Sequence, residues 1–301
     1  MAASASVLAR PRREGFVGTG GRRRGRLIVG ATLVGLFAAS ALLAPWLAPY
    51  DPAAVPAALS ETMLRPPEVA HPLGTDALGR DLLSRVLYGG RVSLALGLGV
   101  EVVIAALGVA IGLLAGYYGG CRDSLLMRVT DVVMAFPSLI LAIGLIAVFE
   151  QPGLDKVALV LVALGWTTIA RVVRGEVLSL KERDYVQAAR ALGVGHTTVL
   201  LRHLLPNAVG PIIVAATIGV GGNMIAEAGL SFLGLGAQAP TISWGSMLAE
   251  GQTFLVSAPW VAFFPGAALL TAVLGINLLG DALRDLLDPR FKPNNKKSLR
   301  E

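Results

Sequence analysis

Six long apolar stretches most constrain how this chain of 301 residues can fold. A helix needs about 20 apolar residues to cross the hydrocarbon core of a bilayer. Spanning segments are expected to be helices, because a helix satisfies its own backbone hydrogen bonds in lipid, whereas barrel strands would show shorter, alternating runs. We therefore predict an all-α integral membrane protein with six transmembrane helices. The expected spans are residues 27–48, 92–117, 125–149, 157–170, 208–235 and 260–279.

The composition agrees with a membrane protein. Hydrophobic residues make up 54% of the chain, charged residues only 15%, and the mean hydropathy is +0.66. Soluble proteins carry roughly 25% charged residues, so this chain has too little polar surface to coat a water-soluble particle. The single cysteine, Cys121, excludes an intramolecular disulfide, and three scattered histidines do not predict a metal site.

The distribution of Lys and Arg predicts the orientation of the helices. Six spans place both termini on one side, where 21 of the 26 basic residues fall, against five on the other side. Because cytoplasmic loops carry the excess of Lys and Arg, we expect a multi-pass protein of the cell inner membrane with both termini in the cytoplasm. If one span were missed or added, the basic residues would no longer be concentrated on one side of the membrane.

The segments outside the spans have distinct compositions. Residues 1–26 are rich in Arg and Gly, and we expect a disordered cytoplasmic tail that is too long for a typical signal peptide and suits contact with anionic lipid. Residues 49–91 are proline-rich, which indicates an irregular extracytoplasmic cap, with a short interfacial helix expected over 81–88. Residues 282–301 form the expected cytoplasmic C-terminal tail.

The most informative segment is the long cytoplasmic loop over residues 171–206, which is too polar to cross a membrane. Asp184 and Gln187 have capping-box spacing, so we expect a helix from Asp184 that ends at Gly193 and Gly195. A helix of about eight residues is marginal alone in water and must pack on another surface. The side chains at spacings of three and four that would face this partner are Tyr185, Ala188, Ala189 and Leu192.

This loop carries a resemblance to a known family. YVQAARALG (185–193) and HLLP (203–206) resemble the EAA motif of type I ABC importer permeases. The segments 71–94, 230–240, 243–248 and 277–290 are similar to the peptide/nickel subfamily, in particular its dipeptide and glutathione permease C subunits. The resemblance covers residues 45–290, and it departs from the family at Gln187, where a glutamate often stands.

The resemblance implies a type I permease domain over residues 92–281, with five helices and a coupling helix that docks into an ATPase. It implies three kinds of partner: a homologous second permease, two cytoplasmic ATPase subunits that bind ATP and Mg, and an extracytoplasmic solute-binding protein. Nucleotide-binding motifs are absent from the sequence, so the chain is expected to be a transport subunit without enzymatic activity or a cofactor of its own. The expected coupling residues are Asp184, Tyr185, Gln187, Ala188, Ala189, Leu192, Gly193, His203 and Pro206.

Ionisable and small residues within the spans give further candidates. Asn223 and Glu227 are candidates for lining the pathway, because the fifth span resembles the pore-lining helix of the family. The alternative for Glu227 is a buried carboxyl group bonded to a neighbouring helix. Asp131 lies one turn from Arg128 and is expected to pair with it. Glycines 108, 112, 116 and 120 form a ridge for close helix packing, within this chain or against the second permease.

The function expected from the sequence is ATP-driven import of di- or oligopeptides or related small solutes. A nickel permease of the same family stays open, and the sequence does not name the solute. The alternative from another class is a secondary transporter driven by protons through Glu101 or Glu227, but it leaves the short polar helix unexplained. A membrane-embedded enzyme lacks any visible nucleophile–base or metal constellation.

Overall fold

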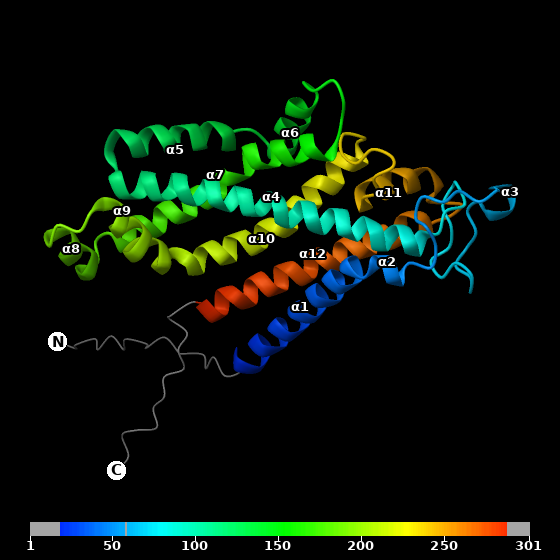
Figure 1. Cartoon of the computed structure of the whole chain (residues 1–301), viewed down its shortest axis with the longest axis horizontal. Coiled ribbons are helices and arrows are strands. Elements are labelled where there is room, and N and C mark those ends of the chain that lie inside the picture. Colours follow the sequence, from blue (N-terminus) through cyan, green and yellow to red (C-terminus); the bar gives the residue numbers. More distant parts are fainter. Residues whose placement is uncertain (1–18, 58, 288–301) are drawn as a thin grey trace, which may run out of the picture.

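The computed structural model describes residues 19–57 and 59–287, and in these ranges it is built from helices joined by loops (Figure 1). The long helices are α1 (Thr19–Leu42), α4 (Leu82–Tyr118), α5 (Gly120–Met134), α7 (Leu154–Leu180), α10 (Leu205–Phe232) and α12 (Trp260–Leu287). The shorter ones are α2 (Ala44–Leu47), α3 (Leu59–Thr62), α6 (Ser138–Ile146), α8 (Asp184–Ala191), α9 (His196–Thr198) and α11 (Trp244–Gly251). A π-helical turn (Val199–Leu204) and a 3₁₀ turn (Gln252–Phe254) complete the set.

The expected six spans appear as five continuous helices and one bent pair. Five helical segments of the described ranges are long and apolar enough to cross a membrane. Helices α5 and α6 together would make the sixth, but they meet at an angle of 85°. Pro137 stands at the break, immediately before α6. Proline cannot donate a backbone hydrogen bond and disfavours helical geometry in the residue before it, so the expected span 125–149 is interrupted there.

The expected interfacial helix over 81–88 is wrong, because these residues are the first turns of α4 itself. Asp81 caps the helix by accepting a hydrogen bond from the backbone N–H of Ser84 at 2.8 Å. The helix then runs without a break through Gly89 and Gly90, which lie against the ring of Trp244. At 1.5 Å per residue this helix is about 55 Å long, so it extends beyond the hydrocarbon core.

The helix expected over 157–170 is longer at its C-terminal end, and the loop expected from residue 171 is correspondingly shorter. Helix α7 continues to Leu180 and carries Arg171 and Arg174. Arg171 donates to Asp131 at 2.5 Å, and Arg174 holds both carboxylate oxygens of Asp123 at 2.5 and 2.7 Å. These pairs let the helix continue past its apolar run. Asp131 therefore pairs with a neighbouring helix, and the expected pair with Arg128 is not formed.

The terminal segments also begin and end differently from the expectation. Helix α1 starts at Thr19, so the part of the expected disordered tail from residue 19 to 26 is helical, and residues 1–18 lie outside the described ranges. Helix α12 continues to Leu287, past the expected end of the sixth span at 279, and residues 288–301 lie outside the described ranges. Figure 1 shows the start of α1, the end of α12 and helix α8 toward the same half of the molecule.

The glycine ridge of α4 packs within the chain, against α7. A Cβ atom at Gly108 would lie 2.7 Å from the Cβ of Ile169, and one at Gly112 would lie 2.6 Å from the carbonyl oxygen of Ala170. Gly116 meets Val177 in the same way, at 2.8 Å. The ridge therefore allows the two backbones to approach closely. Gly120 has no such contact; it is the first residue of α5 and has a φ of +56°.

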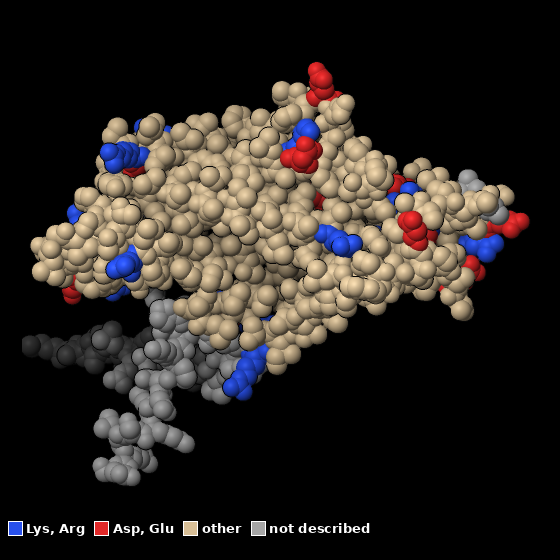
Figure 2. Space-filling view, viewed as in Figure 1, with Lys and Arg blue, Asp and Glu red and all other residues tan. Residues whose placement is uncertain are grey.

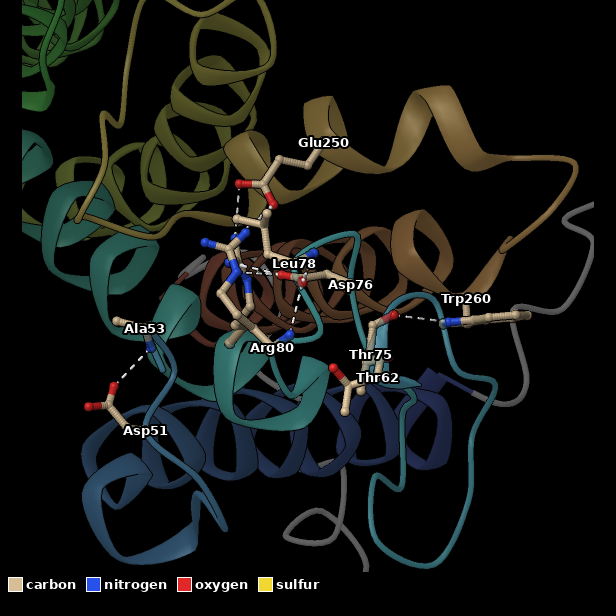
Figure 3. A network of polar contacts seen from close by, with 10 residues as sticks. Asp51, Ala53, Thr62, Thr75, Asp76, Leu78, Arg80, Glu250 and Trp260 are labelled. Carbon is tan, nitrogen blue, oxygen red and sulfur yellow. Dashed lines mark hydrogen bonds and ion pairs between the residues drawn. The ribbon is translucent and has the colours of Figure 1, made fainter. Parts of the chain in front are cut away.

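The proline-rich segment expected to form a cap is fixed to the bundle by a network of charged side chains at the end opposite α8 (Figure 3). Arg85 is 2% exposed and contacts Asp76 of the cap at 3.0 Å and Glu250 of α11 at 2.9 Å. Arg80 joins the same two carboxylates at 2.7 and 3.0 Å. Helix α11, which lies between the expected fifth and sixth spans, was not expected from the sequence. It begins with a capping box at Ser243 and Ser246.

Candidate coupling helix and pathway cavity

Helix α8 covers Asp184–Ala191, which agrees with the short helix expected from the sequence, but its N-terminus is built differently. The capping residue is Arg183, and its side chain makes no capping hydrogen bond. Gln187 donates instead to the carbonyl oxygen of Glu182 at 3.3 Å. The expected capping box of Asp184 and Gln187 is therefore wrong, and both side chains are exposed on the surface.

The C-terminus of α8 is formed by glycine, as the sequence predicts. Gly193 has a φ of +76° and donates to the carbonyl oxygen of Arg190 at 3.0 Å. Val194 donates to Ala189 at 3.1 Å, so the two bonds form a Schellman motif. This backbone conformation favours glycine, because glycine has no Cβ atom to clash with the neighbouring backbone. Gly195 has an ordinary φ of −60° and precedes α9.

The two faces of α8 differ in what they contact. Val186 is fully buried and Ala189 is 8% exposed, and they face the body of the protein. Tyr185, Ala188 and Leu192 form the outward face, where Leu192 is 84% exposed. The expectation that Ala189 shares the face of Tyr185 and Leu192 is wrong, because Ala189 lies three residues after Val186 and faces inward with it.

Side chains at the end of α4 hold α8 and the residues after it in place. The Tyr117 hydroxyl group lies 2.7 Å from Nδ1 of His196, and the Arg190 guanidinium lies over the Tyr117 ring at 5.8 Å. His203 is half-buried, with its ring 6.5 Å from that of Tyr185, and Pro206 lies in the first turn of α10. Sequence reasoning missed Tyr117, since no local pattern links it to a helix about 70 residues later.

A second candidate site is a cavity of about 790 Å³ bounded by α4, α7, α10 and the break between α5 and α6. Its wall is largely apolar and includes Ile104, Phe136 and Leu161. The polar groups that reach it include Glu101 and Asn223, which are joined by a hydrogen bond from Asn223 Nδ2 to Glu101 Oε2 at 2.8 Å. Asn223 was expected to line a pathway and does line this cavity, whereas no role was assigned to Glu101 in the importer reading.

Glu227 does not line this cavity. Its side chain is fully buried and accepts a hydrogen bond from Ser231 at 2.7 Å and another from Ser93 of α4 at 3.4 Å. Glu227 is thus a buried carboxyl group bonded to a neighbouring helix, which is the alternative that the sequence left open beside pathway lining. Both carboxylates lie on membrane-length helices, and the sequence could not tell which one faces the cavity.

On the face shown in Figure 2, a broad uncharged band left of centre separates the charged side chains at the left end from those in the middle and at the right end. Helices α5 and α6 carry exposed apolar side chains, which include Leu125, Val132 and Ile140. A surface of this kind suits lipid tails or another apolar protein surface. Among residues 19–57 and 59–287, no cluster of His, Cys, Asp and Glu could hold a metal ion.

Comparisons with known proteins give consistent matches. Residues 108–293 match the family model for the binding-protein-dependent transport system inner membrane component. The chain is 44% identical over 270 residues to a peptide transport system permease protein of Brucella suis biovar 1, covering 90% of each chain. It is 40% identical over 265 residues to the dipeptide transport system permease protein of Alkalihalophilus pseudofirmus, covering 88% of this chain and 86% of the relative. It is 44% identical over 271 residues to the glutathione transport system permease protein of Escherichia coli, covering 90% of this chain and 88% of the relative.

Proposed function

This chain belongs to the family of inner membrane components of binding-protein-dependent transport systems, and on that premise we propose that it forms half of the pathway of an ATP-driven importer for small peptides. Relatives named for peptide, dipeptide and glutathione transport support this solute class. The other half of the pathway would come from a homologous second permease. A solute-binding protein would deliver the peptide, and two ATPase subunits would bind ATP and Mg.

The observation that carries the coupling role is the outward face of α8. A helix of eight residues is held to the body by Val186 and Ala189, yet it presents Leu192, 84% exposed, at the end of the bundle. An apolar side chain in that position has no partner among the described residues and suits a groove of a cytoplasmic ATPase. The coupling surface would consist of Asp184, Tyr185, Gln187, Ala188, Leu192 and Gly193. Buried Ala189 and half-buried His203 would support it, and Pro206 would begin the helix that follows, α10.

Movement of α8 would reach the pathway through α10. ATP binding would close the ATPase dimer and move α8, and the π-helical turn would transmit this movement to α10, which carries Asn223 to the cavity wall. The spans would rock and open the pathway outward to accept solute, and ATP hydrolysis would reset them. No covalent step would occur on this chain.

A pull-down of the assembled transporter tests the coupling role. Leu192→Asp is expected to abolish co-purification of the ATPase subunits, because it places a charge in an apolar contact. The matched control is Val256→Asp, since Val256 is 98% exposed and lies between α11 and α12 at the other end of the bundle. Equal recovery of the ATPase subunits with both variants would contradict the role of α8.

The sidedness of the chain is tested with the native cysteine. Cys121 is exposed at the start of α5, in the half of the molecule that contains α8. If this end is cytoplasmic, a membrane-impermeant thiol reagent should label Cys121 in inside-out vesicles and leave it unlabelled in sealed right-side-out vesicles. The reverse pattern would place α8 outside the cell and refute the proposal.

Uptake by the reconstituted assembly tests the energy source and the solute. Uptake of a labelled dipeptide should require the binding protein and ATP, and it should persist in the presence of a proton uncoupler. A proton-driven transporter would show the opposite pattern. Competition by nickel ions instead of peptides would point to the metal-importing branch of the family.

A further inference from the structure

Glu101 is a carboxylate near the middle of α4 that has no cationic partner among residues 19–57 and 59–287. The charged pairs of the described residues lie elsewhere, toward the ends of the helices. Ionisable side chains at this depth of a membrane are costly and usually face another protein group or a water-filled path. Glu101 is 4% exposed, so it does not face lipid.

The surroundings of Glu101 are shaped around its carboxylate. A Cβ atom at position 219 of α10 would lie 2.4 Å from Glu101 Oε2, so glycine at this position lets the carboxylate lie directly against α10 in the observed side-chain conformation. Asn223, one turn later, donates to that same oxygen at 2.8 Å. No described side chain donates to Oε1. The carboxylate is thus oriented by α10 and keeps acceptor capacity for a further donor.

The cavity beside Glu101 has the size and polarity of a ligand site. Its volume of about 790 Å³ lies within the usual range for small-molecule pockets, roughly 300–1,000 Å³. The wall is mainly apolar, with a few polar groups such as Thr167 and Thr168 of α7 in addition to the Glu101–Asn223 pair. Such a wall favours a solute that has an apolar body and one cationic group.

We infer that Glu101 binds a primary ammonium group of the solute, the amino terminus of a peptide, as the solute passes through this half of the pathway. This inference rests on the proposed function, because it needs a solute in the cavity. Asn223 is a positioning residue that orients the carboxylate, and the ammonium N–H groups donate to the carboxylate oxygens. The apolar wall discriminates little among the side chains of the solute peptide. The site therefore recognises the amino terminus, which is common to peptides.

The test uses the full assembly in proteoliposomes with a labelled dipeptide and the binding protein. Glu101→Gln keeps an oxygen that accepts from Asn223 but removes the charge. It should lower peptide uptake about tenfold or more, since hydrogen bonds to charged groups are the strong ones. ATP hydrolysis stimulated by the loaded binding protein should stay close to the wild-type rate, because α8 is unaltered.

Glu227→Gln is the matched control. It makes the same change on a membrane-length helix, but Glu227 is bonded to serines and lies off the cavity. Its uptake should stay close to wild type. A second variant, Glu101→Asp, keeps the charge and should retain more uptake than Glu101→Gln.

The possible outcomes separate this inference from the proposed function. If the wild-type assembly shows no ATP-dependent peptide uptake, the proposed function fails, and the inference fails with it. If wild type imports peptide and Glu101→Gln does so equally well, only the inference is overturned. The inference is also overturned if Glu101→Gln no longer associates with the second permease or loses ATPase activity, because Glu101 would then have a structural role.

Discussion

Replacement of Gly193 by aspartate tests whether the conformation of α8 couples the chain to the proposed ATPase subunits. Gly193 adopts a φ of +76°, and a Cβ atom there would meet nothing within 4 Å. The cost of substitution is therefore conformational and not steric. The left-handed conformation costs an L-residue about 1–2 kcal/mol, somewhat less for aspartate, and a negative charge at a helix C-terminus adds roughly 0.3–1 kcal/mol.

The expected consequence is loss of uptake without loss of the protein. A total cost of about 1–2 kcal/mol corresponds to a factor of roughly 5–30 in the population of the docked helix. Helix α8 has only eight residues and is marginally stable without its C-terminal cap, so the population of its docked conformation should fall by this factor. We expect uptake in proteoliposomes to fall at least this far, whereas the amount of chain in the membrane and its association with the second permease stay unchanged.

Two variants isolate the cause. Gly193→Asn tolerates the left-handed conformation and carries no charge, so its uptake should lie between wild type and Gly193→Asp. Gly195→Asp makes the same change two residues later, where φ is −60° and the residue caps α9. Aspartate is favoured at a helix N-cap, so uptake should be nearly normal. Normal uptake by Gly193→Asp, or an equal loss in Gly195→Asp, would refute the reasoning.

Three further predictions concern contacts that hold the bundle and its two ends. Gly112→Ala should destabilise the detergent-solubilised protein by about 1–3 kcal/mol, because it overpacks the contact with α7. Gly99→Ala on the same helix, where a Cβ atom meets nothing within 4 Å, should not lower the melting temperature. Arg85→Ala should cost about 1–3 kcal/mol and reduce the yield of folded protein, because it removes a buried guanidinium that joins Asp76 to Glu250 and leaves Arg80 as their remaining partner. Arg65→Ala, at an exposed pair, should cost at most about 1 kcal/mol in the same assay. Tyr117→Phe removes one hydrogen bond at α9, worth about 0.5–1.5 kcal/mol, and should lower uptake severalfold with unchanged ATPase binding; weakened ATPase binding would instead assign Tyr117 to the docking surface.

The sequence predicted the helices whose evidence is local. The apolar runs gave the spans, and Gly193 gave the end of α8, because hydropathy and backbone conformation depend on neighbouring residues. The continuation of α7 to Leu180 could not be predicted in this way. It depends on Arg171 and Arg174 finding carboxylates on α5, which is a contact between helices and leaves no local pattern.

The direction in which each side chain points from its helix was the least predictable part of the candidate sites. Glu101 and Glu227 both occur in apolar helices, where the surroundings along the sequence are similar on every side. Only the packing of α4 against α10 decides that Glu101 faces the cavity and that Glu227 meets Ser93. The same reason explains the reversed assignment of Ala189, since a short helix with apolar residues on two faces gives no unique inward direction.

The two candidate sites are connected by one continuous segment, and this has a mechanical consequence. One buried cluster joins α8, the π-helical turn and α10. Its members include Val186 of α8, Val199, Leu200 and Leu204 of the turn, and Leu230 near the end of α10. A buried cluster at native density transmits displacement because it resists compression. A movement of α8 would therefore shift α10 as a body. Helix α10 carries Gly219 and Asn223, which lie beside the Glu101 carboxylate. Movement at the docking surface would then alter the geometry of the carboxylate in the cavity, so solute affinity and ATPase state would be linked through α10.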